Sequence, residues 1–136
     1  MKERYLGIDL GGTDIKFVIL DDENTIIEQN SLSTQDSETT PQLWKQKIIE
    51  VIDTKTNEWC TSPDHILRYG ISAPGLADKT NRYIAQMPGR LNGLENYNWA
   101  AELDKDIFII NDAHSACIAE YESFYKNDDV KNMLLL

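Results

Sequence analysis

Long apolar runs are missing from this 136-residue sequence; late in the chain the longest is Met133-Leu134-Leu135-Leu136. A membrane-spanning helix needs about 20 consecutive apolar residues, so we expect no membrane partner. The first residues, Met1-Lys2-Glu3-Arg4, lead directly into an alternating apolar pattern, without the apolar segment and cleavage site of a secretory signal. Cys60 and Cys117 are far apart and lack metal-ligand spacing, which predicts packed, reduced thiols in a cytoplasmic protein.

Positively charged residues are also few. The chain has 13 lysines and arginines against 23 aspartates and glutamates, for a net charge of −10. An acidic domain repels a phosphate backbone, so we expect this chain not to bind nucleic acid directly. The length suffices for one domain with a core, but not for two. Internal repeats and low-complexity tracts are absent, and the polar stretch 33–40 predicts a loop.

What is present begins with a glycine-bearing turn between two alternating apolar arms in residues 5–20. This period of two predicts a β-hairpin whose apolar face consists of Leu6, Ile8, Leu10, Ile15, Phe17 and Ile19. Gly11 and Gly12 allow the backbone to approach a ligand closely, and their N–H groups can point at phosphate oxygens. The alternative is an ordinary hairpin.

A strand, a long helix and another strand are predicted next. Residues 25–32 form a strand antiparallel to the second arm. Thr40 and Pro41 suit the N-cap and first position of a helix, whose apolar stripe is Trp44, Ile48, Val51, Ile52, Lys55 and Trp59. A strand over 66–71 follows. Because a crossover helix connects parallel strands, this strand should lie parallel to the first.

The second half of the chain alternates turns with shorter elements. A short strand is predicted over 83–87, and Asn98 can cap a helix over 99–103. The apolar run 107–110 is typical of a strand buried on both faces of a sheet. A last helix runs from about Asn111 to Tyr125, and the stripe expected to face the sheet is Ala113, Ala116, Cys117, Glu120, Tyr121 and Phe124.

This order of elements predicts an α/β fold of the ribonuclease H-like kind, as in one lobe of the actin-like ATPases. It is a mixed five-stranded sheet, with three antiparallel strands followed by two parallel strands and packed helices. The first strand and those over 66–71 and 107–110 should be parallel, so their carboxyl ends meet at one edge, where ligands bind in open α/β sheets.

Three polar turns should gather at that edge. They are Asp9 with Gly11-Gly12-Thr13, then Ser72-Ala73-Pro74-Gly75, and finally Asn111-Asp112. They come from distant parts of the sequence and converge only in the predicted fold. One adenine nucleotide together with one hydroxyl acceptor would use all three.

Phosphoryl transfer requires positioning, charge neutralisation and a base, and these turns offer each. Asp9 suits Mg²⁺, held through waters, and Gly11-Gly12-Thr13 suits phosphate binding. Lys16 can reach the transferred group as a point charge. Asp112 suits the base that takes a sugar hydroxyl proton, and Asn111 can donate to and accept from a sugar hydroxyl at once.

Structural alternatives exist for each residue. Asp112 or Asn111 can serve only as the N-cap of the last helix, since both residue types are preferred there. Asp9 can be a surface residue at a strand end, and Lys16 a solvated one. Pro74-Gly75 is first of all a turn.

The motifs resemble those of the ROK family of bacterial sugar kinases and sugar-responsive repressors. Asp9-Leu10-Gly11-Gly12-Thr13-Asp14-Ile15-Lys16 resembles its first phosphate motif, and Ala73-Pro74-Gly75 its sugar-side loop. The segment Asn111 to Glu120 is similar to its Asn-Asp-Ala-Asn-Ala-Ala-Ala-Leu-Ala-Glu segment. The order and spacing of these motifs cover nearly the whole chain.

The resemblance implies an ATP-dependent kinase that transfers the γ-phosphate to a hexose or amino-sugar hydroxyl. It assigns Asp112 as the catalytic base, contacts with the sugar to Gly75, Asn111 and Asp112, and ATP and Mg²⁺ to Asp9 through Thr13. The alternative is the sugar-sensing domain of a NagC-like transcriptional regulator without its DNA-binding part. A third reading, an actin-like structural domain, explains the hairpin and sheet but not Asn111-Asp112 with Pro74-Gly75.

The sequence also departs from the family pattern. Gln86-Met87-Pro88-Gly89-Arg90-Leu91 lacks the usual Asn and Trp around Leu-Pro-Gly, and His114 replaces a common Asn. Family members continue into a second lobe with another phosphate loop and a zinc site. We therefore expect residues 1–132 to be an N-terminal lobe and 133–136 the start of a second. Alone, such a lobe should have little kinase activity and should self-associate through its apolar end.

Overall fold

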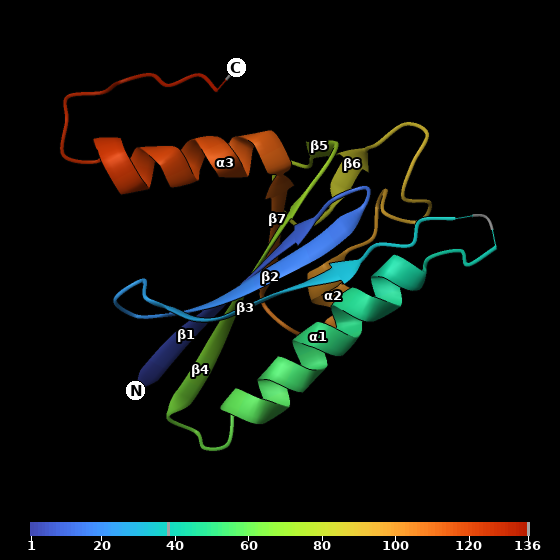
Figure 1. Cartoon of the computed structure of the whole chain (residues 1–136), viewed down its shortest axis with the longest axis horizontal. Coiled ribbons are helices and arrows are strands. Elements are labelled where there is room, and N and C mark those ends of the chain that lie inside the picture. The colour runs from blue at the N-terminus through green and yellow to red at the C-terminus, as the bar shows by residue number, and fades with distance from the viewer. Residues whose placement is uncertain (38, 136) are drawn as a thin grey trace.

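A five-stranded mixed sheet forms the centre of the computed structural model, which describes residues 1–37 and 39–135. The strand order is β3-β2-β1-β4-β7 (Figure 1). These strands are β1 (Lys2–Leu10), β2 (Asp14–Asp21), β3 (Ile26–Ser33), β4 (His65–Ala73) and β7 (Ile107–Asn111). β1, β2 and β3 pair antiparallel, whereas β4 is parallel to β1 and to β7. The predicted set of three antiparallel strands followed by two parallel strands is confirmed.

The hydrophobic core lies on one face of this sheet. Alternate residues of β1 and β2 point toward it, and Leu10 and Ile15 are completely buried. Helix α1 (Leu43–Trp59) covers that face with Trp44 and Ile48, which are also buried. Burial of each such side chain stabilises the fold by about 1.5–3 kcal/mol, so a one-residue slip of either strand would be costly.

The prediction that Thr40 and Pro41 open α1 is wrong. The helix begins at Leu43, and Gln42 before it has left-handed backbone, with φ 61° and no side-chain capping hydrogen bond. The Gln42 side chain packs against Gly93, where an added Cβ would lie 2.6 Å from its Cδ. A contact with a distant loop therefore sets the start of the helix, in place of the local Thr-Pro signal.

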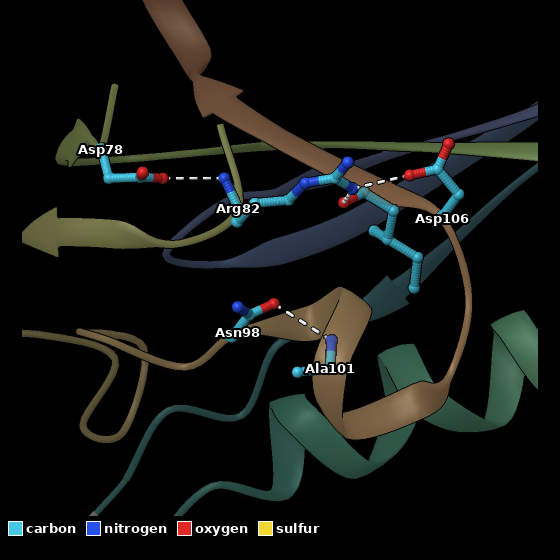
Figure 2. A network of polar contacts seen from close by, with 6 residues as sticks. Asp78, Arg82, Asn98, Ala101 and Asp106 are labelled. Atoms are coloured by element: carbon cyan, nitrogen blue, oxygen red, sulfur yellow. Dashed lines mark hydrogen bonds and ion pairs between the residues drawn. The ribbon is translucent and has the colours of Figure 1, made fainter. Parts of the chain in front are cut away.

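A second, two-stranded sheet follows β4. Its antiparallel strands are β5 (Leu76–Ala77) and β6 (Ile84–Gln86), of which the sequence predicts the second but not the first. In Figure 2 the Asp78 carboxylate accepts the N–H of Arg82 at 2.7 Å, and Arg82 Nη1 donates to Asp106 Oδ1, also at 2.7 Å. These contacts connect the small hairpin to the start of β7.

Helix α2 (Trp99–Leu103) has the N-cap that the sequence predicts. Asn98 Oδ1 accepts a hydrogen bond from the N–H of Ala101 at 3.1 Å (Figure 2). Trp99 is completely buried, and its ring lies 6.4 Å from the Trp44 ring between centroids. The short helix thus closes the core beside α1.

Two predictions about the last strand and helix are wrong. In β7, Ile107 and Ile109 are buried, but Phe108 is 45% exposed, so only one face of the strand is covered. Helix α3 (Asp112–Glu120) and the π-helical turn Tyr121–Tyr125 bury no residue. The physical reason is position, because α3 continues past the end of β7 and does not turn back over the sheet (Figure 1). The residues of the predicted sheet-facing stripe, none of which is buried, are Ala113, Ala116, Cys117, Glu120, Tyr121 and Phe124.

The end of the chain adds no further regular element within the described residues, where 133–135 lie in no helix or strand. Leu136 lies outside the described residues, as does Glu38 within the predicted loop 33–40. The division into a lobe over 1–132 and a second-lobe start over 133–136 stays a prediction. Within the part of the chain that the structure describes, no helix combines the length and apolarity needed to cross a membrane.

Candidate active site

A polar row crosses the open face of the sheet, which is the face opposite the core. The register pairs Asp9 of β1 with Lys16 of β2 and with Ser72 of β4. Directly paired residues share a face, so these side chains lie together. Ser72 Oγ donates a hydrogen bond to Asp9 Oδ1 at 2.5 Å. This charge-assisted bond orients the Asp9 carboxylate and leaves its second oxygen on an exposed surface.

Three hydrogen bonds fix the turn between β1 and β2. Gly11 N–H donates to the Asp14 carbonyl at 2.9 Å, and Thr34 N–H donates to the Thr13 carbonyl at 2.8 Å. The completely buried Thr34 hydroxyl donates to the Gly11 carbonyl at 2.8 Å. Among the described residues, the N–H groups of Gly12 and Thr13 have no hydrogen-bond acceptor. Two backbone donors of a rigid turn therefore remain available to an anion.

Sequence reasoning missed Thr34. Its hydroxyl donates a hydrogen bond to the Gly11 carbonyl, 23 residues earlier in the chain. No local sequence pattern indicates a contact between residues so far apart. The one available signal is its place directly after β3, which pairs with β2 and so brings Thr34 alongside the turn.

Gly75 and Asn111 form the second part of the site. Gly75 has φ +101°, and an added Cβ would lie 2.6 Å from the Gln86 carbonyl oxygen. Asn111 Nδ2 donates to the Gly75 carbonyl at 2.7 Å, while Asn111 Oδ1 accepts from His114 N–H at 3.1 Å. One amide therefore both caps α3 and holds the loop after β4. The sequence-predicted Gly75 and Asn111 are brought into direct contact.

Asp112 is the first residue of α3, and its side chain is exposed. The alternative capping role belongs to Asn111, which is the N-cap. Among the described residues, the hydrogen bond to the Asp112 carboxylate comes from the adjacent Ala113 N–H, at 2.8 Å. The remaining lone pairs can accept a proton from a bound hydroxyl.

The ends of three parallel strands bring these groups to one edge. Asp9 is paired with Ser72, and Ala73, the next residue, is paired with Asn111. The three polar turns therefore follow neighbouring strands in the order β1, β4 and β7. This is the placement that the parallel order predicts, and the chemical role of each residue stays a prediction.

The side chains at this edge fit Mg²⁺ better than they fit a structural Zn²⁺. Within residues 1–37 and 39–135, no three His, Cys, Asp or Glu side chains group as metal ligands. A structural Zn²⁺ site, which uses four protein ligands, does not fit this arrangement. Mg²⁺ keeps several waters and takes one or two carboxylates plus substrate phosphates. The free oxygen of Asp9 fits that requirement.

The strand order and the polar turns at the sheet edge identify the fold class of the chain. A sheet of this order, with a glycine turn after β1 and a capped acidic helix start after β7, has the ribonuclease H-like fold that one lobe of the actin-like ATPases also has. The predicted ribonuclease H-like fold class is therefore confirmed. The model of the ROK family matches residues 5–136, and the chain belongs to that family.

Solved structures of the same family share the fold. The Lmo2764 protein of Listeria monocytogenes, provisionally assigned as an N-acetylmannosamine kinase, is 24% identical with a TM-score of 0.64, over 96% of this chain and 41% of that one. A ROK family transcriptional regulator, a homologue of the E. coli MLC protein, is 14% identical with a TM-score of 0.68, over 89% and 31%. A ROK family glucokinase from Streptomyces griseus, in complex with glucose and AMPPNP, is 22% identical with a TM-score of 0.57, over 87% and 36%.

These matches span well under two thirds of each solved structure, at 41%, 31% and 36% of their lengths. At such identities they show the fold. Comparison with curated proteins gives no match.

Proposed function

We propose that this chain is the N-terminal lobe of an ATP-dependent sugar kinase that transfers the γ-phosphate of ATP to a hexose or amino-sugar hydroxyl. The observation that carries the proposal is the placement of the exposed Asp112 on the sheet edge that also bears the Gly11–Thr13 turn. Membership of the ROK family supports it. The glucose and AMPPNP held by the Streptomyces griseus glucokinase support it as well.

On the nucleotide side, the N–H groups of Gly12 and Thr13 bind phosphate oxygens, and Lys16 adds a positive charge on the open face. Asp9 would hold Mg²⁺, with one carboxylate oxygen kept in place by Ser72. Mg²⁺ supplies charge neutralisation on the phosphate oxygens when it is bound there. The chain's own contribution is two backbone N–H donors in a hydrogen-bonded turn and one ammonium group on the adjacent strand β2.

On the acceptor side, Asp112 takes the proton of the sugar hydroxyl as that oxygen attacks the γ-phosphorus. The new P–O bond forms as the P–O bond to the departing ADP breaks, so protons and phosphate are conserved. Asn111 uses one N–H on Gly75 and one Oδ1 lone pair on His114. Its second N–H and remaining lone pair bind another sugar hydroxyl.

A second candidate is the sugar-sensing domain of a ROK transcriptional regulator. The likeness to the MLC homologue, with a TM-score of 0.68, favours it. A regulator needs the sugar contacts of Gly75 and Asn111 but no general base. The presence of the Asp112 carboxylate therefore favours the kinase.

Replacement of Asp112 by Asn tests the choice in the whole protein that contains this lobe. General-base catalysis contributes about 10²–10⁴-fold, so kcat for sugar-dependent ADP release should fall by that factor. Asp22→Asn, at an exposed position in the β2–β3 turn, is the matched control and should leave kcat unchanged.

Unaltered phosphorylation by the Asp112→Asn protein would reject the kinase proposal. Sugar binding by the unsubstituted protein without any phosphorylation would support the regulator. The isolated chain 1–136 should bind ligand but turn over little, because it offers one side of a cleft.

A further inference from the structure

Arg90 lies against the glycine turn, although it comes from the loop between β6 and α2. A Cβ built on Gly12 would lie 2.7 Å from Arg90 Cζ and 2.9 Å from Nη1, and would overlap Nη2. The guanidinium therefore fills the space that a side chain at position 12 would need. Gly12 and Thr13 are also the residues whose N–H groups have no acceptor within the described residues. A guanidinium borders two unpaired backbone donors.

Arg90 lacks a protein partner where the other arginines have one. Its guanidinium makes no hydrogen bond or ion pair within residues 1–37 and 39–135. The partners of the other arginines are Glu3 for Arg68, Asp106 for Arg82 and the Trp59 ring for Arg4. In a chain of net charge −10, carboxylates are plentiful. The guanidinium of Arg90 has five N–H donors and, among the described residues, no carboxylate that pairs with it. It is therefore suited to bind an anion that comes from outside the chain.

Two acidic side chains bind the same loop without pairing with Arg90. Asp36 Oδ2 accepts the N–H of Leu91 at 2.9 Å, and Glu95 Oε1 accepts the N–H of Met87 at 2.5 Å. These carboxylates anchor the loop backbone before and after Arg90. They hold the arginine in place and leave its charge unneutralised.

The loop backbone is shaped around Arg90. Gly89 has φ +84° and Leu91 has φ +52°, a left-handed conformation that leucine rarely adopts. Leu91 is kept there by burial, since it is 2% exposed, and by its hydrogen bond to Asp36. The position of Arg90 therefore results from long-range contacts and not from a flexible surface loop.

We propose that Arg90 is a phosphate-binding residue, which together with the N–H groups of Gly12 and Thr13 holds the oxygens of one phosphate group at the turn. The inference rests on the proposed function and adds Arg90 to the groups that bind the phosphate there. The phosphate belongs to the polyphosphate donor or to a phosphorylated sugar, and both present the same oxygens. Arg90 is suited to either because its planar donors match two phosphate oxygens at once.

Titration of the chain 1–136 by calorimetry or NMR tests this inference. The probes are MgATP, inorganic tripolyphosphate and glucose 6-phosphate, and the variants are Arg90→Gln and Arg90→Lys. Arg90→Gln should raise the Kd for MgATP and tripolyphosphate at least about tenfold, and Arg90→Lys should recover part of the loss. A loss confined to glucose 6-phosphate supports the same residue with the phosphate on the sugar. Arg68→Gln, which removes one positive charge in β4, four residues before Ser72, should change Kd by less than about twofold.

Equal losses in Arg90→Gln and Arg68→Gln would overturn the inference, since net charge alone would explain them. An unchanged Kd in Arg90→Gln for all three probes would also overturn it, while binding by the unsubstituted chain would leave the proposed function standing. Failure of the unsubstituted chain to bind any of the probes would overturn both. Thermal unfolding of each variant checks that the exposed substitutions preserve the fold.

Discussion

Gly75 is a position where the site depends on the absence of a side chain. Its φ of +101° disfavours any L residue, and an added Cβ would lie 2.6 Å from the Gln86 carbonyl oxygen and 2.7 Å from Ile84 Cγ2. Left-handed backbone costs about 1–2 kcal/mol, and overpacking costs about 1–3 kcal/mol. Gly75→Ala should therefore lower the free energy of unfolding by about 2–4 kcal/mol, measured by urea denaturation.

Gly70→Ala is the matched control for this substitution. Gly70 lies in β4, five residues before Gly75, has no positive φ, and a Cβ there meets no atom within 4 Å. Its stability should be unchanged or slightly increased, because alanine reduces the entropy of the unfolded chain. Equal effects at the two positions would show that the loop after β4 adapts to a side chain.

At the residue scale, the sequence predicts which polar residues reach the edge but not how they are held. Asp9, Gly75 and Asn111 follow strands, and strand ends are readable from alternation and turn residues. Their partners are not readable in this way. Ser72 orients Asp9 although the two residues are 63 positions apart in the chain, and Arg90 reaches Gly12 through a loop without regular structure.

At the scale of elements, the β5–β6 hairpin depends on one carboxylate. Asp78 accepts the N–H groups of Thr80 and Arg82 at 2.7 Å and of Tyr83 at 3.1 Å, as well as the Thr80 hydroxyl. Partial desolvation raises the pKa of Asp78, but these hydrogen bonds outweigh it and hold the pKa well below its ordinary value. The charged form is therefore part of the hairpin.

Stability should follow the titration of this group. A depressed folded-state pKa gives a contribution that is complete above the unfolded-state pKa of about 3.9 and is lost as pH falls through the folded-state value. Asp78→Asn should lower Tm at neutral pH, and its gap from the unsubstituted chain should narrow as pH falls below about 4. Circular dichroism melts across the acid range measure this gap.

Asp22→Asn is the control for the pH series, since the Asp22 carboxylate makes no hydrogen bond with the described residues. Its Tm should follow that of the unsubstituted chain throughout. An Asp78→Asn gap that stays constant through the acid range would mean that shape, and not charge, holds the hairpin.

The elements that the sequence predicts well are those whose signal is local. The β1–β2 hairpin is given by a period of two, and the body of α1 by an apolar stripe. β5 has two residues and no alternation, and it exists because Asp78 closes the turn beside it. The start of α1 and the exposure of α3 depend on what lies next to them in space, which no short window of sequence contains.

On the scale of the whole molecule, the sheet has one covered face and one open face. The open face forms a hollow of about 700 Å³, lined by residues of all five strands, including Gly7, Val18, Gly70, Phe108 and Ile110. The sequence predicts a sheet covered on both faces near β7, because a continuous apolar run carries no information on which face has a partner. The structure instead leaves apolar surface unpaired.

Apolar exposure continues beyond the sheet, since Phe124 is 71% exposed and Leu134 79% exposed. Self-association would remove these exposed apolar side chains from water, so we expect the chain to self-associate as concentration rises. Sedimentation velocity over about a hundredfold concentration range measures this, and the double variant Phe124→Ser with Leu134→Ser should shift the equilibrium toward monomer.

Ile26→Ser is the control, because Ile26 is 57% exposed on β3, at the other edge of the sheet, and its replacement should have little effect. A single monomer species of the unsubstituted chain across the range would contradict the prediction, and an equal response to Ile26→Ser would show that general hydrophobicity drives the association rather than the C-terminal segment.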